Sequence, residues 1–532
     1  MKTYFEFATG NVARHGDTDV FPFPIENRIF FDLPDDTVAC LEDIHKDFDR
    51  AIYDMPPIFE KALSVVGYNG FRPAAQLDPL WNAYLLGLVS SIADKIEAAR
   101  VAKEAAVVYS YRVQLDPTHY LLFDTNIGWT EFQQRSLVLA NGHPFVLCCD
   151  ISDFYPRIYH HRLENALNMT GADKTITSRI MRLLSRFSGG VSYGLPVGGP
   201  AARLLSELVL NRTDKLLLTH KTVFCRFVDD YRIFANSKAE AYQALLLLSQ
   251  ILLADEGLTL QRSKTRILSR DEFTATNPLS EPPDDPEPEH TEARSLLRLR
   301  LRFDPYSPTA EEDYENLKEM LSKYDIVGML AREVRKARID ESMTRKLIKS
   351  IKYLDAPTRQ RAVVSLLDSI EVLYPLFAQI MIVIKAIYAD FDKDTKEYTQ
   401  RCLRALITER SHIISVPTHL SYALRLLAED NSIECDAILA RLYNEQHSMM
   451  VRRDIILAMA KHNSDHWLSN HSKQYSTLTE WEKTAMVIAS YVLGDEGDHF
   501  RKPLKGGASP TALLAMKWAD TKAKAGKWEV PL

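Results

Sequence analysis

Two adjacent carboxylates in a predicted hairpin are the residues of this chain best suited to catalysis. Asp229 and Asp230 lie between two apolar segments, residues 222–226 and 231–235, and this pattern predicts a β-hairpin with both acids at its tip. Adjacent acids in a tight turn repel each other, and a bound divalent cation would remove that cost. A third acid, Asp150, ends the apolar run 145–149, a predicted strand. A carboxylate at a strand's end facing such a hairpin is the arrangement of a two-metal nucleotidyl-transfer site.

The segment that begins at Asp150 predicts further parts of this site. Carboxylate and carbonyl oxygens suit Mg²⁺, with Mn²⁺ as an alternative, so we expect Asp150, Asp229 and the Ile151 carbonyl to bind the metal. Phe154 and Tyr155 follow. Tyr155 is expected to lie beneath the sugar of an incoming nucleotide, where its ring would clash with a ribose 2′-hydroxyl. Taken alone, the segment fits a core aromatic pair after a strand equally well.

A glycine-rich turn and a lysine complete the set of candidate residues. Around Val197 and Gly198, glycines allow the backbone to approach a nucleotide closely, and the helix predicted from Pro200 presents free N–H groups. Lys264 lies in or near a predicted strand, and it could protonate the leaving pyrophosphate or neutralise a triphosphate. Asp230 is expected to support the site or the primer end. An ordinary loop and a solvated lysine are the alternative interpretations, but the order of these segments along the chain favours one shared site.

The elements predicted around these residues follow a β-α-β-β-α-β order. They are a strand (145–149), a helix (160–187), a glycine-rich turn (189–199), a helix (200–218), the hairpin (222–235), a helix (238–255) and a strand (258–268). This order is typical of the ferredoxin-like split βαβ fold, on which polymerase palms are built. The fold does not by itself establish the function, and the acids carry most of the argument.

Together, these segments resemble reverse transcriptases. Residues 150–155 look like motif A, residues 194–198 like motif B, residues 227–230 like motif C and residues 257–264 like motif D. Arg112 is similar to a fingers arginine that contacts the triphosphate. The chain departs from most members at Val197, where they have glutamine, and at Phe227-Val228, where they have Tyr or Phe followed by Ala. Loss of the glutamine removes a polar contact near the nascent base pair, which puts strict templating in doubt.

In these departures, and in a helical domain in place of a thumb, the chain resembles the bacterial abortive-infection and defence-associated reverse transcriptases of the unknown-group type. The segment 299–307 also resembles that group. The resemblance implies action against phages and synthesis of single-stranded DNA from dNTPs. It further implies priming on a tyrosine hydroxyl, synthesis without a template or with a noncoding RNA, and assembly into trimers or hexamers. Tyr4, Tyr53 and Tyr68 are candidates for a priming tyrosine.

The domain organisation that follows has four parts. We predict fingers and an N-terminal region in residues 1–140, a palm with the polymerase motifs in 141–272, an acidic, proline-rich linker in 273–293 and an α-helical repeat domain in 294–532. The fold class is therefore an α+β fingers-palm with a ferredoxin-like palm, followed by an all-α domain. Amphipathic segments of ordinary helix length, joined by short turns, make that domain HEAT-like.

Composition excludes several other classes of protein. The chain has 532 residues, of which 46% are hydrophobic and 26% charged, with a formal net charge of −6. It is therefore expected to be globular. Proteins that bind long nucleic acids are usually basic, so we do not expect this acidic chain to be a general binder of that kind. We expect no membrane-spanning run and no signal pattern at the N-terminus. Six scattered cysteines without zinc-ligand spacing favour a reducing, cytoplasmic location.

Two alternatives to a defence polymerase remain open at this stage. In the first, the protein is a scaffold that binds RNA or a phage protein and whose chemistry is vestigial. The intact set Asp150, Asp229, Asp230 and Lys264 counts against it. In the second, it is a templated reverse transcriptase of retron or intron type, against which the acidic net charge counts.

Overall fold

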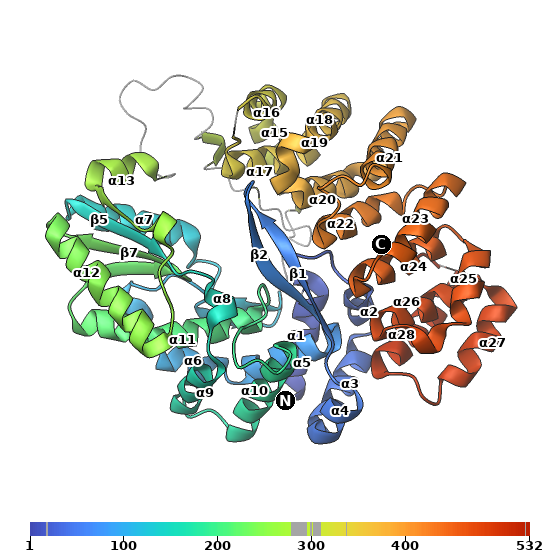
Figure 1. The fold of residues 1–532 in the computed structure, drawn as a ribbon, viewed down its shortest axis with the longest axis horizontal. Coiled ribbons are helices and arrows are strands. Elements are labelled where there is room, and N and C mark those ends of the chain that lie inside the picture. The colour runs from blue at the N-terminus through green and yellow to red at the C-terminus, as the bar shows by residue number, and fades with distance from the viewer. Residues whose placement is uncertain (17–19, 278–294, 298–300, 302–309, 337, 527) are drawn as a thin grey trace. The chain divides into compact units, whose positions relative to one another are not determined.

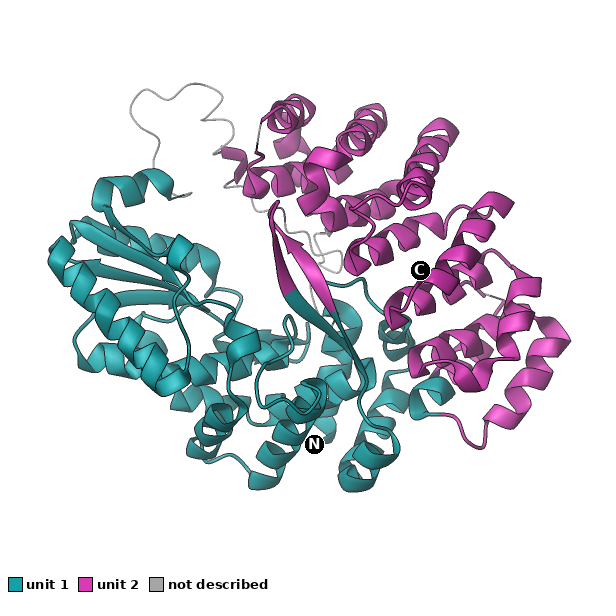
Figure 2. Cartoon of the chain, viewed as in Figure 1, with its two compact units in different colours: residues 1–61, 73–280, 509–514 teal, residues 62–72, 281–508, 515–532 magenta. Residues whose placement is uncertain are grey.

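The computed structural model describes the whole chain except residues 17–19, 278–294, 298–300, 302–309, 337 and 527 (Figure 1). The chain divides into two compact units (Figure 2). Unit 1 comprises residues 1–61, 73–280 and 509–514, and unit 2 comprises residues 62–72, 281–508 and 515–532. The predicted fingers and palm, apart from residues 62–72, therefore belong to unit 1. Most of the predicted linker 273–293 and most of the segment 299–307 lie outside the described residues.

Unit 1 is an α+β unit. It contains α1 (Lys2–His15), α2 (Ile25–Asp32), α3 (Pro34–Lys46), α4 (Phe48–Asp54), parts of the hairpin β1 (Phe59–Val66) and β2 (Gly70–Leu77), α5 (Pro79–Ser91), α6 (Ala93–Ala99), the 3₁₀ turn η1 (Lys103–Ala105), β3 (Val113–Asp116), β4 (Leu121–Phe123), α7 (Trp129–Asn141), β5 (Phe145–Asp150), α8 (Phe154–Arg157), α9 (His160–Met169), α10 (Lys174–Phe187), α11 (Pro200–Thr219), β6 (Val223–Phe227), β7 (Asp230–Ala235), α12 (Lys238–Ile251), the π-helical turn η2 (Leu252–Glu256), the 3₁₀ turn η3 (Arg262–Lys264), β8 (Arg266–Ser269) and α13 (Arg270–Thr276).

A four-stranded antiparallel sheet of order β6-β7-β5-β8 forms the centre of the predicted palm. Its apolar core against α7 and α13 includes Val146, Phe234, Phe132 and Phe273. On the opposite face, the Tyr231 hydroxyl donates to the Asp214 carboxylate of α11. Helix α12 contacts β5 and β7 on this face (Figure 1). Since side chains alternate along a strand, Asp150 and Asp230 share the face of Val146 and Phe234, away from α11.

The predicted elements form with two differences that have local causes. The helix expected over 160–187 is two helices, because Gly171 between them has a φ of +68° and Asp173 caps α10 by accepting from the N–H groups of Thr175 and Ile176. The strand expected over 258–268 is regular only as β8. Before it, the chain pairs briefly with the end of β5 through an Ile151–Leu260 bridge and then turns through η3.

Unit 2 is built from helices, apart from the tip of the β1–β2 hairpin. Its helices are α15 (Ala310–Ser322), α16 (Ile326–Val334), α17 (Glu341–Ser350), η4 (Ile351–Tyr353), α18 (Ala356–Asp368), α19 (Ile370–Leu373), η5 (Tyr374–Leu376), α20 (Phe377–Ile387), η6 (Tyr388–Asp390), α21 (Lys393–Thr408), α22 (Pro417–Leu427), α23 (Ile433–Glu445), α24 (Met449–Lys461), α25 (Asp465–Ser472), η7 (Tyr475–Thr477), α26 (Glu480–Ala489), η8 (Ser490–Val492), α27 (Gly494–Leu504) and α28 (Pro510–Lys524), through which the division between the units passes.

Alternate helices of unit 2 pack on one another along the chain. Helix α20 contacts α22, α22 contacts α24, and α24 contacts α26. This succession agrees with the predicted all-α composition, whereas the HEAT-like assignment stays a prediction. At the hairpin tip, the Tyr68 hydroxyl donates to the Val372 carbonyl over 2.8 Å.

One helical stretch of unit 2 qualifies by length and composition as a membrane span. In the described residues, Ile370–Asp390 has a mean hydropathy of 1.8 over its best window, and 56% of that window is buried inside the structure. The expectation that no apolar run is long enough therefore does not hold by this measure. A core helix of a soluble protein gives the same signal, so the stretch is weak support for a membrane location.

Candidate active site

Three predicted carboxylates meet at one end of the β5–β7 pair. Asp150 is the last residue of β5 and lies directly opposite Asp230, the first residue of β7. Asp229 precedes it in the turn, and the Asp229 carbonyl accepts a hydrogen bond of 3.1 Å from the N–H of Ile151. Directly opposed residues on antiparallel strands have neighbouring side chains on the same face. The sheet therefore brings together the acids that the sequence predicted to act together.

The electrostatics of this group are those of carboxylates held together against their repulsion. Burial raises the pKa of Asp229 to about 7, and the charges of Asp150 and Asp230 add to the rise. Burial, followed by the charge of Asp150, raises the pKa of Asp230 to about 6. Like charges opposed across a sheet are destabilising. The site is therefore a place where the fold loses stability unless a positive charge is supplied.

That positive charge comes from Lys264, whose Nζ donates to Asp150 Oδ2 over 2.7 Å. Burial lowers the pKa of Lys264, but its hydrogen bond to Asp150 and the charge of Asp150 outweigh burial, so the pKa lies above its ordinary value. The Lys264 side chain is 63% exposed. The predicted proximity of Lys264 to the acids is present, although its ammonium is paired with a carboxylate that was expected to bind metal.

The donor chemistry of the site fits a divalent cation. Within the described part of the chain, no group of three or more His, Cys, Asp or Glu side chains is already arranged to hold a metal ion. Nevertheless, burial, and after it the charges of neighbouring acids, raises the pKa values of Asp229 and Asp230, and a bound cation would relieve the cost of holding these carboxylates charged. Carboxylate oxygens are the ligands that Mg²⁺ and Mn²⁺ prefer. Asp150 and Asp229 are the residues that would hold the metal once Asp150 releases Lys264, and the Ile151 carbonyl stays a predicted ligand.

The two aromatic residues after Asp150 have different surroundings. Phe154 is 2% exposed and packs edge-on against Tyr155, so its position does not support the predicted contact with a nucleotide. Tyr155 is half-buried, and its hydroxyl accepts a hydrogen bond from Ser206 Oγ of α11 over 3.4 Å. Burial raises the pKa of Tyr155 well above its ordinary value. The predicted contact of Tyr155 with a sugar stays a prediction.

The glycine-rich turn is fastened to the segment that follows β5. The N–H of Leu195 donates to the Tyr155 carbonyl over 2.9 Å, and the Gly194 carbonyl bonds the ring of His160 over 2.7 Å. Gly198 has a φ of +117°, a conformation that favours glycine, and Val197 before it is half-buried. The turn that was expected to contact a nucleotide is thus held beside Tyr155 by backbone contacts.

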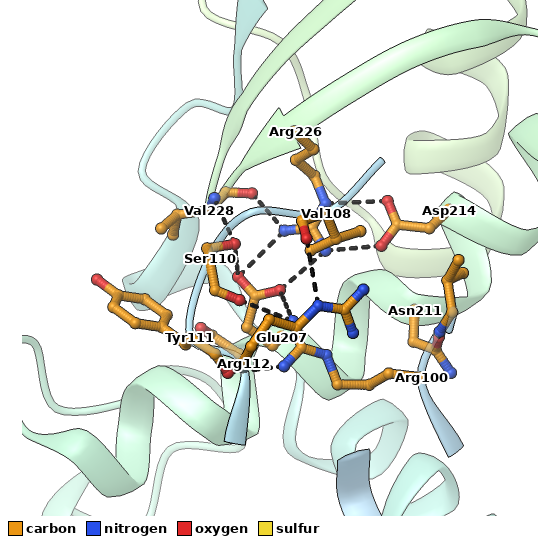
Figure 3. Close-up of polar contacts among 12 residues, drawn as sticks. Arg100, Val108, Ser110, Tyr111, Arg112, Glu207, Asn211, Asp214, Arg226 and Val228 are labelled. Atoms are coloured by element: carbon orange, nitrogen blue, oxygen red, sulfur yellow. Dashed lines mark hydrogen bonds and ion pairs between the residues drawn. The ribbon is translucent and has the colours of Figure 1, made fainter. Parts of the chain in front are cut away.

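Arg112 lies inside unit 1 instead of at the site. Its side chain is 1% exposed, and its Nη1 donates to Glu97 over 3.1 Å. Its Nε donates to the Val108 carbonyl over 3.2 Å (Figure 3). The expected contact between Arg112 and a triphosphate is not supported, because a guanidinium buried in this way does not reach a ligand. The prediction for Arg112 came from its likeness to a motif, and nothing in the sequence indicated that the Glu97 carboxylate of α6 would bind it.

Sequence reasoning missed the residues that lie beneath the turn. Arg226, directly before the motif, is fully buried, and its guanidinium contacts Glu207 and Asp214 of α11. Ser110 is also fully buried and bonds the turn from the other side. The only sequence signal was an arginine inside an apolar strand, since a charge there requires a buried partner.

Comparison with known proteins agrees with this arrangement of residues. Residues 95–295 match the family model of the reverse transcriptase (RNA-dependent DNA polymerase), and this range includes every residue of the site. These residues form a reverse transcriptase domain. The retron Ec86 reverse transcriptase of Escherichia coli is 23% identical over 145 residues, which cover 26% of this chain and 43% of that protein. The chain thus spans less than half the length of the curated relative that it matches.

Two solved telomerase structures are also similar to the chain. Apo telomerase from Candida tropicalis has a TM-score of 0.32 and 10% identity, with 69% of each chain covered. Telomerase from Candida albicans, in complex with the TWJ fragment of telomeric RNA, has a TM-score of 0.31 and 9% identity, with 78% of this chain and 70% of that chain covered. The family match over residues 95–295 covers the residues at which the three carboxylates meet.

Proposed function

We propose that this protein is a reverse-transcriptase-type DNA polymerase of antiphage defence, of the abortive-infection type. It would join deoxynucleotides from dNTPs by two-metal transfer with Mg²⁺, or with Mn²⁺ in its place. The observation that carries the proposal is the meeting of Asp150, Asp229 and Asp230 at one end of β5 and β7, within the range matched by the reverse transcriptase model. The defence role rests on the resemblance at Val197 and Phe227-Val228.

The chain's own residues have distinct tasks in this reaction. When bound, the metal ions would supply a Lewis acid for the phosphoryl oxygens and lower the pKa of the attacking hydroxyl. Asp150 and Asp229 would hold them, and Asp230 would support the site. The attacking hydroxyl loses its proton to solvent, a bond forms between its oxygen and the α-phosphorus, and the bond from that phosphorus to pyrophosphate breaks. Lys264 leaves Asp150 and gives its proton to the pyrophosphate.

The primer and the assembly are further parts of the proposal. The attacking hydroxyl is either a nucleic acid 3′-OH or a tyrosine of this chain, and Tyr53, 81% exposed, is the most accessible of the three candidates. Single-stranded DNA is the expected product, made without a template or on a noncoding RNA. We expect the HEAT-like helices of unit 2 to mediate assembly into a trimer or hexamer. The protein would act in the cytoplasm, which agrees with its six free thiols.

The test is incorporation of labelled dNTPs by the purified protein with Mg²⁺ and no added nucleic acid. Products are resolved on a denaturing gel before and after protease treatment, with Asp229→Ala as the inactive control. Labelled DNA whose mobility shifts after protease supports protein priming, and Asp229→Ala should abolish both synthesis and phage protection. A folded, inactive Asp229→Ala protein that still protects cells would instead support the scaffold alternative.

A templated reverse transcriptase of retron type is the second candidate. The match with the retron Ec86 reverse transcriptase over 145 residues favours it specifically. It predicts that an RNA copurifies with the protein, that synthesis stops when this RNA is digested, and that the product is complementary to it. Template-independent synthesis would yield a product whose sequence is unrelated to any copurified RNA.

A further inference from the structure

The turn that carries Asp229 contains a residue in a costly conformation. Phe227 and Asp230 are paired, so the hairpin loop consists of Val228 and Asp229 alone. Val228 has a φ of +55° and is 7% exposed. A β-branched residue in the left-handed region is a genuine outlier, and hairpin loops of this length usually place glycine, asparagine or aspartate there. Such a conformation persists only where the surroundings enforce it.

Two side chains enforce it by binding the Val228 backbone from both sides (Figure 3). The Val228 N–H donates to Ser110 Oγ over 2.9 Å, and the Val228 carbonyl accepts from Arg226 Nη1 over 2.7 Å. The Asp229 carbonyl in turn accepts from the N–H of Ile151. The peptide groups on both sides of the Asp229 Cα atom are therefore oriented by hydrogen bonds, which sets the direction in which its side chain leaves the backbone.

Ser110 and Arg226 are themselves held by a buried ionic network. Glu207 accepts from Ser110 Oγ over 2.5 Å and from Arg226 over 2.9 and 3.1 Å, and Asp214 accepts from Arg226 over 2.6 and 2.9 Å. Arg100 donates to Glu207 over 2.7 Å. The side chains of the two arginines and two acids are at most 2% exposed. Arg100 also pairs with Glu97, which binds Arg112, so three arginines balance three acids and the network is neutral.

The serine contact separates a role in positioning from a role in stability. The ion pairs of Arg226 with Glu207 and Asp214 connect α11 to the sheet, and they do not require the left-handed conformation of Val228. The hydrogen bond from the Val228 N–H to Ser110 Oγ is made by the turn itself and not by α11. It connects the network to the one backbone N–H whose position depends on the left-handed conformation of Val228.

We propose that Ser110 and Arg226 are positioning residues that hold Val228 in the left-handed conformation and thereby direct Asp229 toward the metal. This inference rests on the proposed metal-dependent polymerase site. Without Ser110, Val228 can relax to an ordinary conformation, which turns the peptide before Asp229 and moves its carboxylate away from Asp150.

The test is Mn²⁺ binding to the full-length protein, measured by electron paramagnetic resonance, in Ser110→Ala and in the same change combined with Val228→Gly. Ser110→Ala removes the hydrogen bond from the Val228 N–H together with the one to Glu207, and loss of the first is expected to weaken Mn²⁺ binding about five- to tenfold. Glycine adopts the left-handed conformation without strain, so in the Val228→Gly background Ser110→Ala should change the affinity less than about twofold. The control is Ser136→Ala, because Ser136 is equally buried but bonds the Phe132 carbonyl and Cys225 Sγ instead of the turn.

The outcomes separate this inference from the proposed function. The inference is overturned if Ser110→Ala binds Mn²⁺ with wild-type affinity, or if it loses the same affinity with and without Val228→Gly. This holds even if the protein incorporates dNTPs. The expected Mn²⁺ pattern in a protein that incorporates no dNTPs upholds the inference and removes the polymerase proposal. Arg226→Lys, which retains the buried charge, should weaken Mn²⁺ binding similarly, and wild-type affinity in that folded variant excludes Arg226 from the role.

Discussion

Replacing Asp229 with asparagine should stabilise the metal-free protein at neutral and alkaline pH while abolishing nucleotidyl transfer. The amide has nearly the shape of the carboxylate but carries no charge. It therefore removes the repulsion from Asp150 and Asp230 that contributes to the raised pKa of Asp229. A substitution that destroys the proposed activity would thus make the fold more stable, which is the opposite of what removal of a buried structural acid does.

The size of the effect follows from the pKa. Burial and the neighbouring acids raise it from 3.8 to about 7, and about three units correspond to about 4 kcal/mol at 1.36 kcal/mol per unit. Asparagine is also desolvated, and the repulsion is shared among the three acids, so on the order of 2 kcal/mol is expected. Because the folded pKa exceeds the unfolded one, protonation of Asp229 favours the folded state. That stability is fully present below the unfolded pKa of 3.8 and is lost as the pH rises through about 7.

The assay is hydrogen exchange of peptides from β5, β6 and β7, corrected for intrinsic rates, at about pH 5.5 and about pH 8 with and without Mg²⁺. Asp229→Asn should protect these peptides more than wild type at the higher pH, and the difference should narrow at the lower pH. Mg²⁺ should protect the wild type and leave the variant unchanged. Asp271→Asn, at a side chain that is 92% exposed, is the control. Lower protection in Asp229→Asn at about pH 8, or a difference independent of pH, would refute the reasoning.

Three further substitutions test the other residues. Lys264→Met removes the ammonium that competes with metal for Asp150, so Mn²⁺ binding, measured by paramagnetic resonance, should tighten roughly a few-fold. The rate of dNTP incorporation, measured by single-turnover kinetics, should fall by about tenfold or more, because the proposed general acid is lost. Tyr155→Ala should raise ribonucleotide relative to deoxyribonucleotide incorporation in competition assays, and Tyr155→Phe should not. Arg112→Met should lower thermal stability, because it leaves Glu97 without this partner, but should leave the KM for dNTPs unchanged; a raised KM would restore the triphosphate contact inferred from sequence.

The acids could be predicted from sequence because their signals are local. Asp229 and Asp230 interrupt an alternation of apolar residues, and a hairpin is the short-range structure that such an interruption indicates. Asp150 required one further step, that an apolar run ending in an acid is a buried strand. The register that places Asp150 opposite Asp230 then follows from the packing of Val146 and Phe234 on the same face.

The remainder could not be predicted because it depends on contacts distant in sequence. Nothing local to Arg112 indicates that Glu97 will bind it, and nothing local to Val228 indicates a positive φ, since valine is a poor residue for that conformation. Ser110 meets Val228 across 118 positions of the chain. Such pairs are fixed by the tertiary fold, which a single sequence does not reveal.

Two local rules are broken within two adjacent residues of the turn, and this proximity is itself informative. Val228 adopts a conformation that valine avoids, and Asp229 is held where burial and neighbouring negative charges disfavour its ionised carboxylate. Either feature alone would lower stability without evident benefit, because a glycine and an asparagine at these positions would relieve both costs. Their coincidence is expected if the turn is shaped to present a carboxylate to a cation, since the cation relieves the repulsion only when the turn holds the carboxylate in place. Backbone strain and like-charge repulsion at one site therefore support a cation-binding catalytic turn, which agrees with the family match on independent physical grounds.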